Sequence, residues 1–284
     1  MMRLVRQPGP ADSKRHLACT TGAEEISITL QAGEMLLPGI AAAFEARGID
    51  SAYLHMHDAA VSQLDFVIPA PSPDAEHAAW WSQTRTLAGP GEVVEAGLVF
   101  GRRDGGAFIH CHGAWRDNAG NRYAGHMLPD RCMLKDTTRL RGWVFPDARF
   151  EGGFDAETNF TLFQPVATAA GQAPRHDAAL VRLRPNVEIG QALAEICREL
   201  CWAGAELHGI GSLIGARFDD GRALESYATE FLLRRGRIAV KGNCAETQID
   251  ILIVGLDGEI EEGLLQPDEN AVLMTCELVL LRRD

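Results

Sequence analysis

The segment from Ala107 to Leu128, AFIHCHGAWRDNAGNRYAGHML, constrains the fold of this chain more than any other stretch. Its run DNAGN, Asp117–Asn121, combines Asx residues with glycine, and these residue types adopt the backbone conformations of tight turns. We therefore predict a β-hairpin whose two antiparallel strands are Phe108–Arg116 and Arg122–Leu128. Any fold of this chain must then contain a sheet in which alternate residues of this segment share one face.

The hairpin contains three histidines, and the predicted register brings them together. A five-residue loop pairs Arg116 with Arg122, so that His112 faces His126 across the strands, with about 5 Å between Cβ atoms. His110 lies two residues along the same strand and points to the same face. Three imidazoles at one point form a ligand set for a divalent transition metal with an open coordination position. A shift of the register by one residue would break this convergence.

The predicted metal ligands are therefore His110, His112 and His126. Neutral imidazoles without an obvious carboxylate fit zinc first, with nickel, iron and copper as alternatives. The competing interpretation is a set of three hydrogen-bonded histidines on a half-buried sheet face. Cys111 falls on the opposite face of its strand and is expected in the core.

Other side chains are candidates for a pocket around the metal, each with a simpler structural explanation. His55 and His57 form a second same-face pair, for which a structural or interface role is the alternative. Trp115 and Arg116 follow the histidines on the hairpin, where packing at the end of the turn would also explain them. Glu95 is a candidate acid or base, or one residue of a solvated strand face. Trp80 and Trp81 are expected in the core or at an interface. No residue is identified as catalytic.

Composition limits the classes of function. The 284 residues are 46% hydrophobic and 23% charged, which is typical of a folded chain. The net charge of −12 argues against nucleic acid or an anionic membrane as the main partner. The sequence has neither an apolar run of membrane-spanning length nor a signal peptide at its N-terminus, so we expect a cytoplasmic protein. Seven cysteines without paired CxxC spacing indicate neither a disulfide framework nor a zinc ribbon.

The remaining segments predict a mixture of strands and helices. Residues 1–25 read as an irregular N-terminal arm. Apolar periodicity and turn residues then predict the elements that follow. These are a strand at Ile26–Leu30, a helix at Leu36–Arg47, a strand–turn–strand over Ser51–Ile68, and strands at Glu92–Phe100 and Arg139–Phe145.

The second half of the chain repeats the first. Residues 179–210 align without gaps on 26–57 with a shift of 153 positions, and Thr247–Leu265 matches the hairpin, with Gly263 at the position of Gly125. We therefore predict two tandem modules, 26–165 and 179–284, joined by a linker at 166–178 that is rich in Ala, Pro and Gly. At the positions of His110, His112 and His126 the second module is expected to carry Asp250, Leu252 and Leu264, so only the first module would bind metal.

The hairpin and the segment HGIGSLIGARF, His208–Phe218, resemble the plant-and-prokaryote-conserved (PPC) domain family. The hairpin is the specific part, with an HxH pair, a polar turn and Gly-His-Leu as its typical form. The resemblance implies an α/β fold of the α+β type, in which each module is a mostly antiparallel sheet carrying a packed helix. It also implies trimeric assembly and a metal site at His110, His112 and His126. The chain lacks the basic AT-hook of plant members, and tandem duplication is unusual for the family.

Two classes of function follow from these observations. In the first, the metal binds or acts on a small molecule, as a Lewis acid or by lowering the pKa of bound water. In the second, the metal is structural and the protein is a regulatory or scaffold protein. The DNA-binding label of the family is a third and weaker reading, because the chain has no basic arm. A carboxylate near the metal would favour the first class, and a closed site with four protein ligands would favour the second. We expect a homo-oligomer, with a trimer as the state that the resemblance implies.

Overall fold

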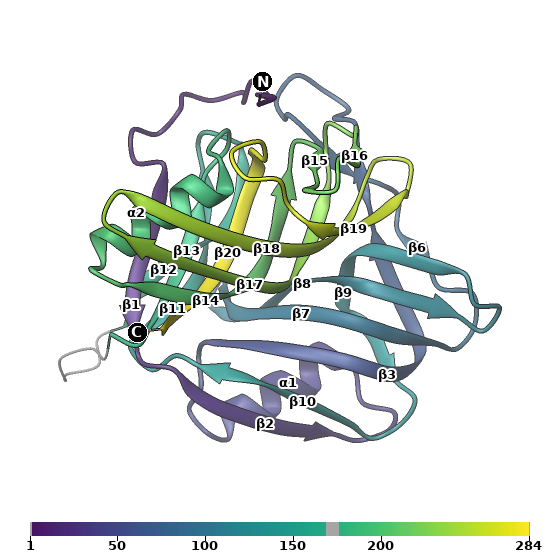
Figure 1. The fold of residues 1–284 in the computed structure, drawn as a ribbon. Helices are drawn as coiled ribbons and strands as arrows, with labels where there is room; N and C mark the ends of the chain where they lie inside the picture. The colour runs from purple at the N-terminus through teal and green to yellow at the C-terminus, as the bar shows by residue number, and fades with distance from the viewer. Residues whose placement is uncertain (1, 169–175, 284) are drawn as a thin grey trace.

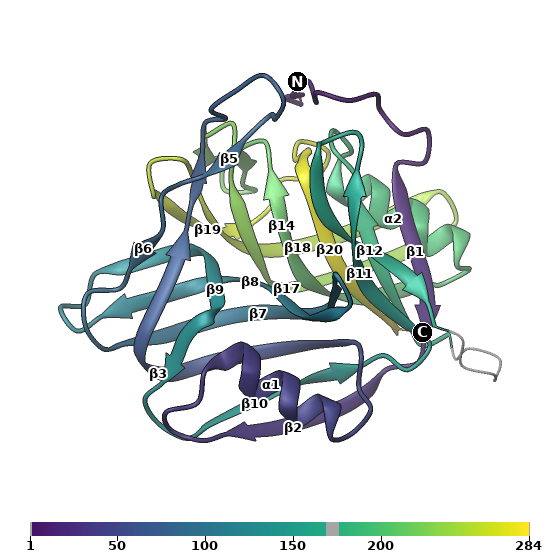
Figure 2. The same ribbon diagram turned by 180° about the vertical axis from the view of Figure 1, so that it is seen from behind.

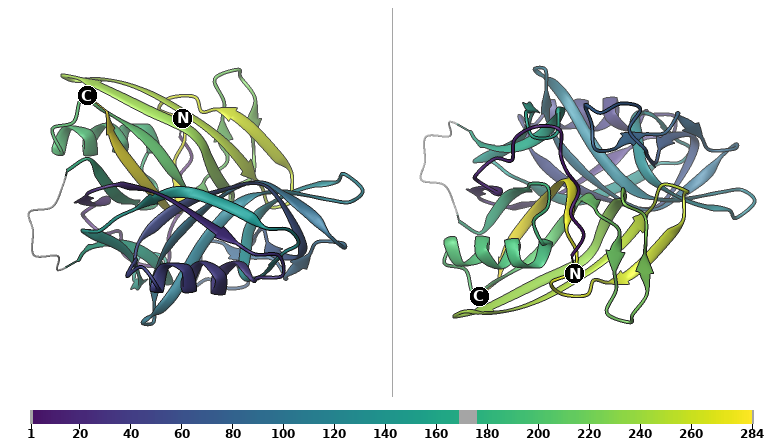
Figure 3. Two further views of the ribbon diagram at one scale, coloured as in Figure 1. Left: turned by 90° about the horizontal axis from the view of Figure 1, so that it is seen from below. Right: turned by 90° about the horizontal axis from the view of Figure 1, so that it is seen from above.

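The computed structural model describes residues 2–168 and 176–283, which form two β-sheets packed face to face with a helix on each outer side. Figure 3 shows these four layers edge-on. The fold is thus of the mixed α and β class and consists mostly of antiparallel strands. β11 pairs in parallel with β7 at one position, and the other pairings between the described strands are antiparallel. No helix in these ranges is long and apolar enough to cross a membrane.

The first sheet contains nine strands and carries the histidine hairpin (Figure 1). Its order is β12-β11-β7-β8-β9-β3-β10-β2, and β6 pairs with β3. β3 also pairs with β7, so that β3, β7, β8 and β9 close into a ring. The strands are β2 (Glu24–Leu30), β3 (Ala52–Val67), β6 (Arg85–Thr86), β7 (Gly91–Arg103), β8 (Gly106–Asp117), β9 (Arg122–Leu134), β10 (Thr138–Val144), β11 (Ala148–Asp155) and β12 (Phe160–Ala167).

The second sheet contains seven strands in the order β1-β13-β20-β14-β17-β18-β19. Two further pairs, β4 with β5 and β15 with β16, stand outside both sheets. The strands of the second sheet are β1 (His16–Thr21), β13 (Ala178–Leu183), β14 (Gly204–Leu213), β17 (Glu230–Lys241), β18 (Cys244–Val254), β19 (Ile260–Leu264) and β20 (Val272–Arg283). The short strands are β4 (Pro69–Ala70), β5 (Trp80–Trp81), β15 (Ala216–Arg217) and β16 (Ala223–Leu224).

Each helix packs on its sheet through residues at helical spacing. α1 (Leu36–Glu45) buries Leu36, Ile40 and Phe44 in the core beneath the first sheet. α2 (Ile189–Glu199) buries Leu193 and Ile196 in the core of the second sheet. A third apolar cluster lies between the sheets and includes Tyr53, Val99, Ile210, Leu232 and Val279. Because the sheets bury this face against each other, the face that carries the histidines is an interior surface of the molecule.

The predicted hairpin register is confirmed. Arg116 pairs with Arg122 and His112 pairs with His126 across β8 and β9. The side chain of Asp117 closes the turn, because one of its carboxylate oxygens accepts the backbone N–H groups of Ala119 and Asn121, both at 2.9 Å. This local Asx chemistry explains why the register could be predicted from the sequence.

Two of the predicted segments differ from the structure. The last part of the expected irregular arm forms β1, which pairs antiparallel with β13 of the second sheet. The expected strand–turn–strand over 51–68 is one long strand, β3. Asp58 has a φ of +48°, but the pairing of β3 with β7 keeps the same register on both sides of it. The register shifts of β3 occur in its pairing with β9, between Val61 and Gln63 and between Leu64 and Phe66. The segment expected to contain a turn is therefore part of a continuous strand. Most of the predicted linker, residues 169–175, lies outside the described residues.

The predicted correspondence between the two hairpins is wrong by two positions on one strand. Gly113 pairs with Gly125 in the first half, and Ile251 pairs with Gly263 in the second. Gly125 and Gly263 have nearly the same unusual φ, +154° and +153°. By this pairing Asp250, which faces Leu264, stands where His112 stands, and Gln248 takes the place of His110. Leu252 instead faces Glu262 and packs into the core of the first sheet.

Candidate metal centre

Three histidine rings from β8 and β9 converge on the face of the first sheet that meets the second. One ring nitrogen from each of His110, His112 and His126 lies within 4.8 Å of the others. The ring centroids are 4.7 Å apart for His110 and His112, 4.8 Å for His110 and His126, and 5.4 Å for His112 and His126. Among the described residues, these three form the one group of three or more potential metal ligands. The convergence expected from the hairpin register is therefore present.

Hydrogen bonds from the second sheet orient two of the rings. His112 Nδ1 lies 3.0 Å from the Phe231 carbonyl oxygen on β17, which can only accept, so Nδ1 carries the proton. His110 Nδ1 lies 2.7 Å from Glu277 Oε2 on β20, and a carboxylate there likewise accepts from Nδ1–H. Neutral rings protonated at Nδ1 present the lone pair of Nε2. The pattern is that of metal-binding histidines, which donate their second N–H to a carboxylate or carbonyl.

The Nε2 atoms of the first two rings face each other. His110 Nε2 and His112 Nε2 are 3.1 Å apart. At this distance either one ring donates a hydrogen bond to the other, or both nitrogens bind a common cation. Tetrahedral zinc with Zn–N bonds of 2.0–2.1 Å holds its nitrogen ligands roughly 3.3 Å apart. The three imidazoles are a donor set for a transition metal, and the His110–His112 pair is close to this spacing, whereas the three ligand atoms together span up to 4.8 Å. The alternative is a proton that one of the two rings donates to the other.

The middle histidine of the triad is more deeply buried than the sequence suggested, whereas His110 and His126 are partly exposed. His112 is 3% exposed, because the second sheet covers the face that was expected to be half-buried. Burial lowers the pKa of His112 well below its ordinary value, and the neighbouring His110 and His126 lower it further. Burial and His110 lower the pKa of His126 in the same way. Both rings are therefore neutral at pH 7, the form that binds metals.

A small pocket of about 80 Å³ opens beside the triad, between the two sheets. One buried carboxylate lines it: Glu230 accepts the backbone N–H of His126, and burial raises the pKa of Glu230 to about 8. Its Oε2 and the nearby Thr275 Oγ1 are buried without a hydrogen-bond partner. Trp80, Trp81 and Phe160 also line the pocket. The arrangement offers a metal site, two unpartnered oxygens and an aromatic wall.

Three of the residues predicted for the pocket lie elsewhere. Trp115 is completely buried in the core of the first sheet. Arg116 is at the surface, where its guanidinium lies 3.1 Å from the carboxylate of Glu92. Glu95 faces the second sheet but is bound to Arg234, with 3.2 Å between Oε1 and Nε. None of the three is among the residues that line the pocket beside the histidines.

His55 and His57 belong to a second cluster on the same sheet face. His55 faces Gly97, which in turn faces His112, so one strand position separates the cluster from the triad. The rings of His55 and His208 lie 5.2 Å apart, and Trp143 lies 4.6 Å from His208. A side chain at Gly97 would collide with Tyr53 Oη and Leu232 Cδ1, at 2.4 and 2.7 Å from the Cβ position. Apolar packing at this glycine therefore separates the two clusters.

This second cluster predicts a pH dependence of stability. Burial, together with His208 and His57, lowers the pKa of His55 from 6.5 to about 4, against the opposing effect of Glu206. Above pH 6.5 the ring is neutral in both the folded and unfolded states, and stability is complete. As the pH falls from 6.5 to 4, only the unfolded state binds the proton, so the folded state loses up to roughly 3 kcal/mol.

Chemical denaturation between pH 4.5 and 7.5, with a chelator present, would measure this slope. His55→Gln should remove the part of the pH dependence that comes from His55. His57→Gln, at an exposed neighbouring position, should keep that part of the pH dependence. The other ionisable groups near His55 are His208 and Glu206 on β14 of the second sheet and Arg141 on the neighbouring strand β10. An identical slope in wild type and His55→Gln would show that His55 is not the group that titrates.

Sequence reasoning missed the residues that the second half contributes to the site. Glu277 and Glu230 are single carboxylates within apolar strands, MTCELVLL and ATEFLL. A charged residue in a strand that is otherwise buried needs a partner, and this signal could have identified both. Phe231 contributes only its backbone carbonyl and leaves no sequence signal. The packing of β17 against the first sheet brings this carbonyl to His112.

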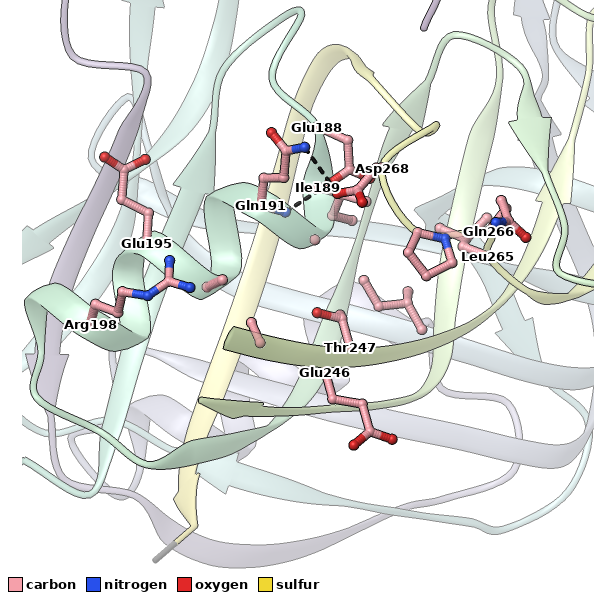
Figure 4. A pocket seen from close by; sticks show the side chains of 15 residues that line it. Glu188, Ile189, Gln191, Glu195, Arg198, Glu246, Thr247, Leu265, Gln266 and Asp268 are labelled. Atoms are coloured by element: carbon pink, nitrogen blue, oxygen red, sulfur yellow. Dashed lines mark hydrogen bonds between the residues drawn. The ribbon is translucent and has the colours of Figure 1, made fainter. Parts of the chain in front are cut away.

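A larger hollow lies elsewhere and shows no comparable chemistry. It is a groove of about 670 Å³ beside α2, open to solvent and lined by Glu188, Gln191, Glu246 and Asp268 among others (Figure 4). Three of its polar residues already bond to one another. Glu188 accepts the Gln191 backbone N–H at 2.7 Å, and the Gln191 side chain donates to Asp268 at 2.9 Å. Size alone does not make this groove a site.

No protein-family model and no curated protein matches the chain. Several solved structures are similar to it, and the resemblance to PPC domains is seen among them. A PPC protein from Pyrococcus horikoshii is 16% identical, with a TM-score of 0.39 over 51% of this chain and 93% of its own. A metal-containing protein from Archaeoglobus fulgidus is 19% identical, with a TM-score of 0.39 over 51% of this chain and 94% of its own. A hypothetical Salmonella protein is 18% identical, with a TM-score of 0.40 over 52% and 97%.

Proposed function

We propose that this protein binds one zinc ion per chain at His110, His112 and His126 and uses the open coordination position to bind or transform a small molecule. The observation that carries the proposal is the convergence of three imidazoles, in which His110 Nε2 and His112 Nε2 lie 3.1 Å apart and their Nδ1 atoms face acceptors on the second sheet. Histidines that bind metals commonly donate their second N–H to such acceptors.

The surroundings of the triad favour a reactive or ligand-binding metal over a structural one. A structural zinc site in proteins is closed by four protein ligands. Within residues 2–168 and 176–283, no fourth histidine, cysteine or carboxylate joins the group of three. A buried carboxylate, Glu230, instead lines the pocket beside the histidines with one oxygen unpartnered. A carboxylate close to a three-histidine site is the feature expected of a metal-dependent enzyme or small-molecule binder.

Each residue has a definite role in this proposal. The three imidazoles hold the ion, and a bound metal polarises an oxygen of its ligand or lowers the pKa of a bound water. Glu277 and the Phe231 carbonyl fix the tautomer and orientation of His110 and His112. Because burial raises the pKa of Glu230 to about 8, this side chain is mostly protonated at pH 7 and can donate a hydrogen bond to whatever enters the pocket. The covering second sheet excludes bulk water, which strengthens these interactions.

The first test combines elemental analysis with a change at Glu277. Purified protein should contain one metal per chain, predominantly zinc. Glu277→Gln keeps an oxygen that can accept from His110 Nδ1 but removes the charge, so zinc affinity should fall about 10- to 100-fold in competition with a chromophoric chelator. Glu206→Gln is the matched control, because Glu206 pairs with His208 at 3.0 Å in the other cluster and should leave affinity unchanged. Equal losses in the two variants would contradict the role assigned to Glu277.

We also infer that the chain arose as two copies of one module and that it self-associates. The spacing of the helices supports the first inference, since α1 and α2 begin 153 residues apart, at Leu36 and Ile189. The matched glycines Gly125 and Gly263 support it further. Self-association, with a trimer as the state implied by the family resemblance, is a prediction that light scattering at micromolar concentration would test; a strictly monomeric species would contradict it. DNA binding is not part of the proposal, because the net charge of −12 opposes it.

A further inference from the structure

Aromatic rings gather at the mouth of the pocket beside the histidines. Trp80 and Trp81 on β5 have ring centroids 5.3 Å apart, and both contact Phe160 at the start of β12, at 5.4 and 5.0 Å. His77 adds a fourth ring, 4.6 Å from Trp80. β5 pairs with Pro69–Ala70, which follows β3, and Figure 2 shows β5 beyond the end of the first sheet. Three of the four rings, those of Trp80, Trp81 and Phe160, line the same pocket as the three histidines.

The ring at the outer edge of this group is open to solvent. Trp81 is 39% exposed and is one of the few large apolar side chains in the described ranges that remain so. Phe160, by contrast, is 8% exposed and packs against both tryptophan rings. A flat apolar surface held in place by neighbouring rings loses little conformational entropy when a second flat group stacks on it. Trp81 is therefore a preformed stacking surface at the entrance to the site.

The enclosed space beside the histidines is small. The whole pocket has a volume of about 80 Å³, which is less than the roughly 150 Å³ of an engineered cavity that encloses benzene. A whole aromatic ring therefore does not fit inside, but a head group of a few atoms does. The head would meet the histidine nitrogens together with the unpartnered oxygens of Glu230 and Thr275. A polar head inside and a flat apolar body outside match the two parts of the pocket.

From this division we propose that the ligand of the site is a small aryl compound whose oxygen-bearing head binds at the metal and whose ring stacks on Trp81. The inference rests on the proposed metal site and adds the class of its ligand. Trp81 is the residue that selects the aromatic body, Phe160 holds the tryptophans in position, and the histidines bind the head. Aliphatic compounds with the same head bind at the metal but lose the contact with Trp81.

Two hydroxamates test the proposal, because both bind zinc through the same head. Acetohydroxamate presents a methyl group and benzohydroxamate a phenyl ring. Their dissociation constants would be measured by calorimetry on zinc-loaded full-length protein. The two compounds differ in acidity, so the readout is the change in their affinity ratio between variants. Trp81→Ala should reduce the preference for benzohydroxamate about tenfold, while metal content and acetohydroxamate affinity stay at wild-type values. Phe154→Ala, at a 69% exposed aromatic outside the pocket, is the matched control and should keep the ratio.

The outcomes separate this inference from the proposed function. If zinc is retained and acetohydroxamate binds, but the ratio is the same in wild type, Trp81→Ala and Phe160→Ala, the aryl ligand is excluded and the metal site stands. If the wild-type protein retains no metal, the proposed function fails and the inference fails with it. Loss of acetohydroxamate binding in Trp81→Ala, with metal still present, would also overturn the inference, because Trp81 would then act on the head and not on the ring.

Discussion

Replacement of His112 by alanine is expected to abolish metal binding and also to lower the free energy of unfolding. The imidazole is one of three ligands, and two remaining histidines are too few donors to hold zinc tightly. The side chain is 3% exposed and donates to the Phe231 carbonyl. Its removal takes away this hydrogen bond and leaves a cavity, which should cost about 1–3 kcal/mol even in metal-free protein.

Elemental analysis and denaturant unfolding with a chelator present measure the two effects separately. His57→Ala is the matched control, because His57 lies on the same sheet face but is exposed and outside the pocket. It should change neither quantity. Wild-type metal content in His112→Ala would show that the ligand assignment is wrong. Wild-type stability of the metal-free variant would show that the contact with Phe231 contributes little.

Leu252→Ala should cause a large loss of stability without loss of metal. Leu252 belongs to the second half of the chain, yet it is 1% exposed and packs into the core of the first sheet. Removing three buried carbons from a closely packed core costs about 2–5 kcal/mol, depending on how far the surroundings relax. The metal ligands all lie on β8 and β9, so one ion per chain should remain bound.

Leu264→Ala provides the comparison on the neighbouring strand. Leu264 is 39% exposed, and its truncation should change the unfolding free energy by roughly 0.5 kcal/mol or less. Both variants would be compared by chemical denaturation and by metal content. If both substitutions changed the unfolding free energy by the same small amount, Leu252 would not be packed in the core of the first sheet. Loss of metal in Leu252→Ala alone would instead show that the second half holds the hairpin in its metal-binding shape.

The parts of the structure that sequence could predict are those determined by contacts between near neighbours. The hairpin register follows from the side chain of Asp117 capping its own turn, and strand alternation then brings His110, His112 and His126 to one face. Helix α1 follows from the spacing of Leu36, Ile40 and Phe44. Both features depend on interactions within about twenty residues, which a local pattern records. The prediction of a turn within Ser51–Ile68 failed, because β3 continues through Asp58 although this residue has a positive φ.

Only the tertiary structure decided what surrounds the histidines. Glu277 and the Phe231 carbonyl reach the triad from strands more than 100 residues away, and the packing of the two sheets determines their positions. The same packing buries His112 and separates the triad from His55 at Gly97. It also brings Trp81 and Glu230 to one pocket while leaving Glu95 bound to Arg234 outside it. Sequence could thus predict the ligands of the candidate metal, because they share a hairpin. The partners that orient them follow from sheet-on-sheet contacts, which leave no periodic signal in the chain.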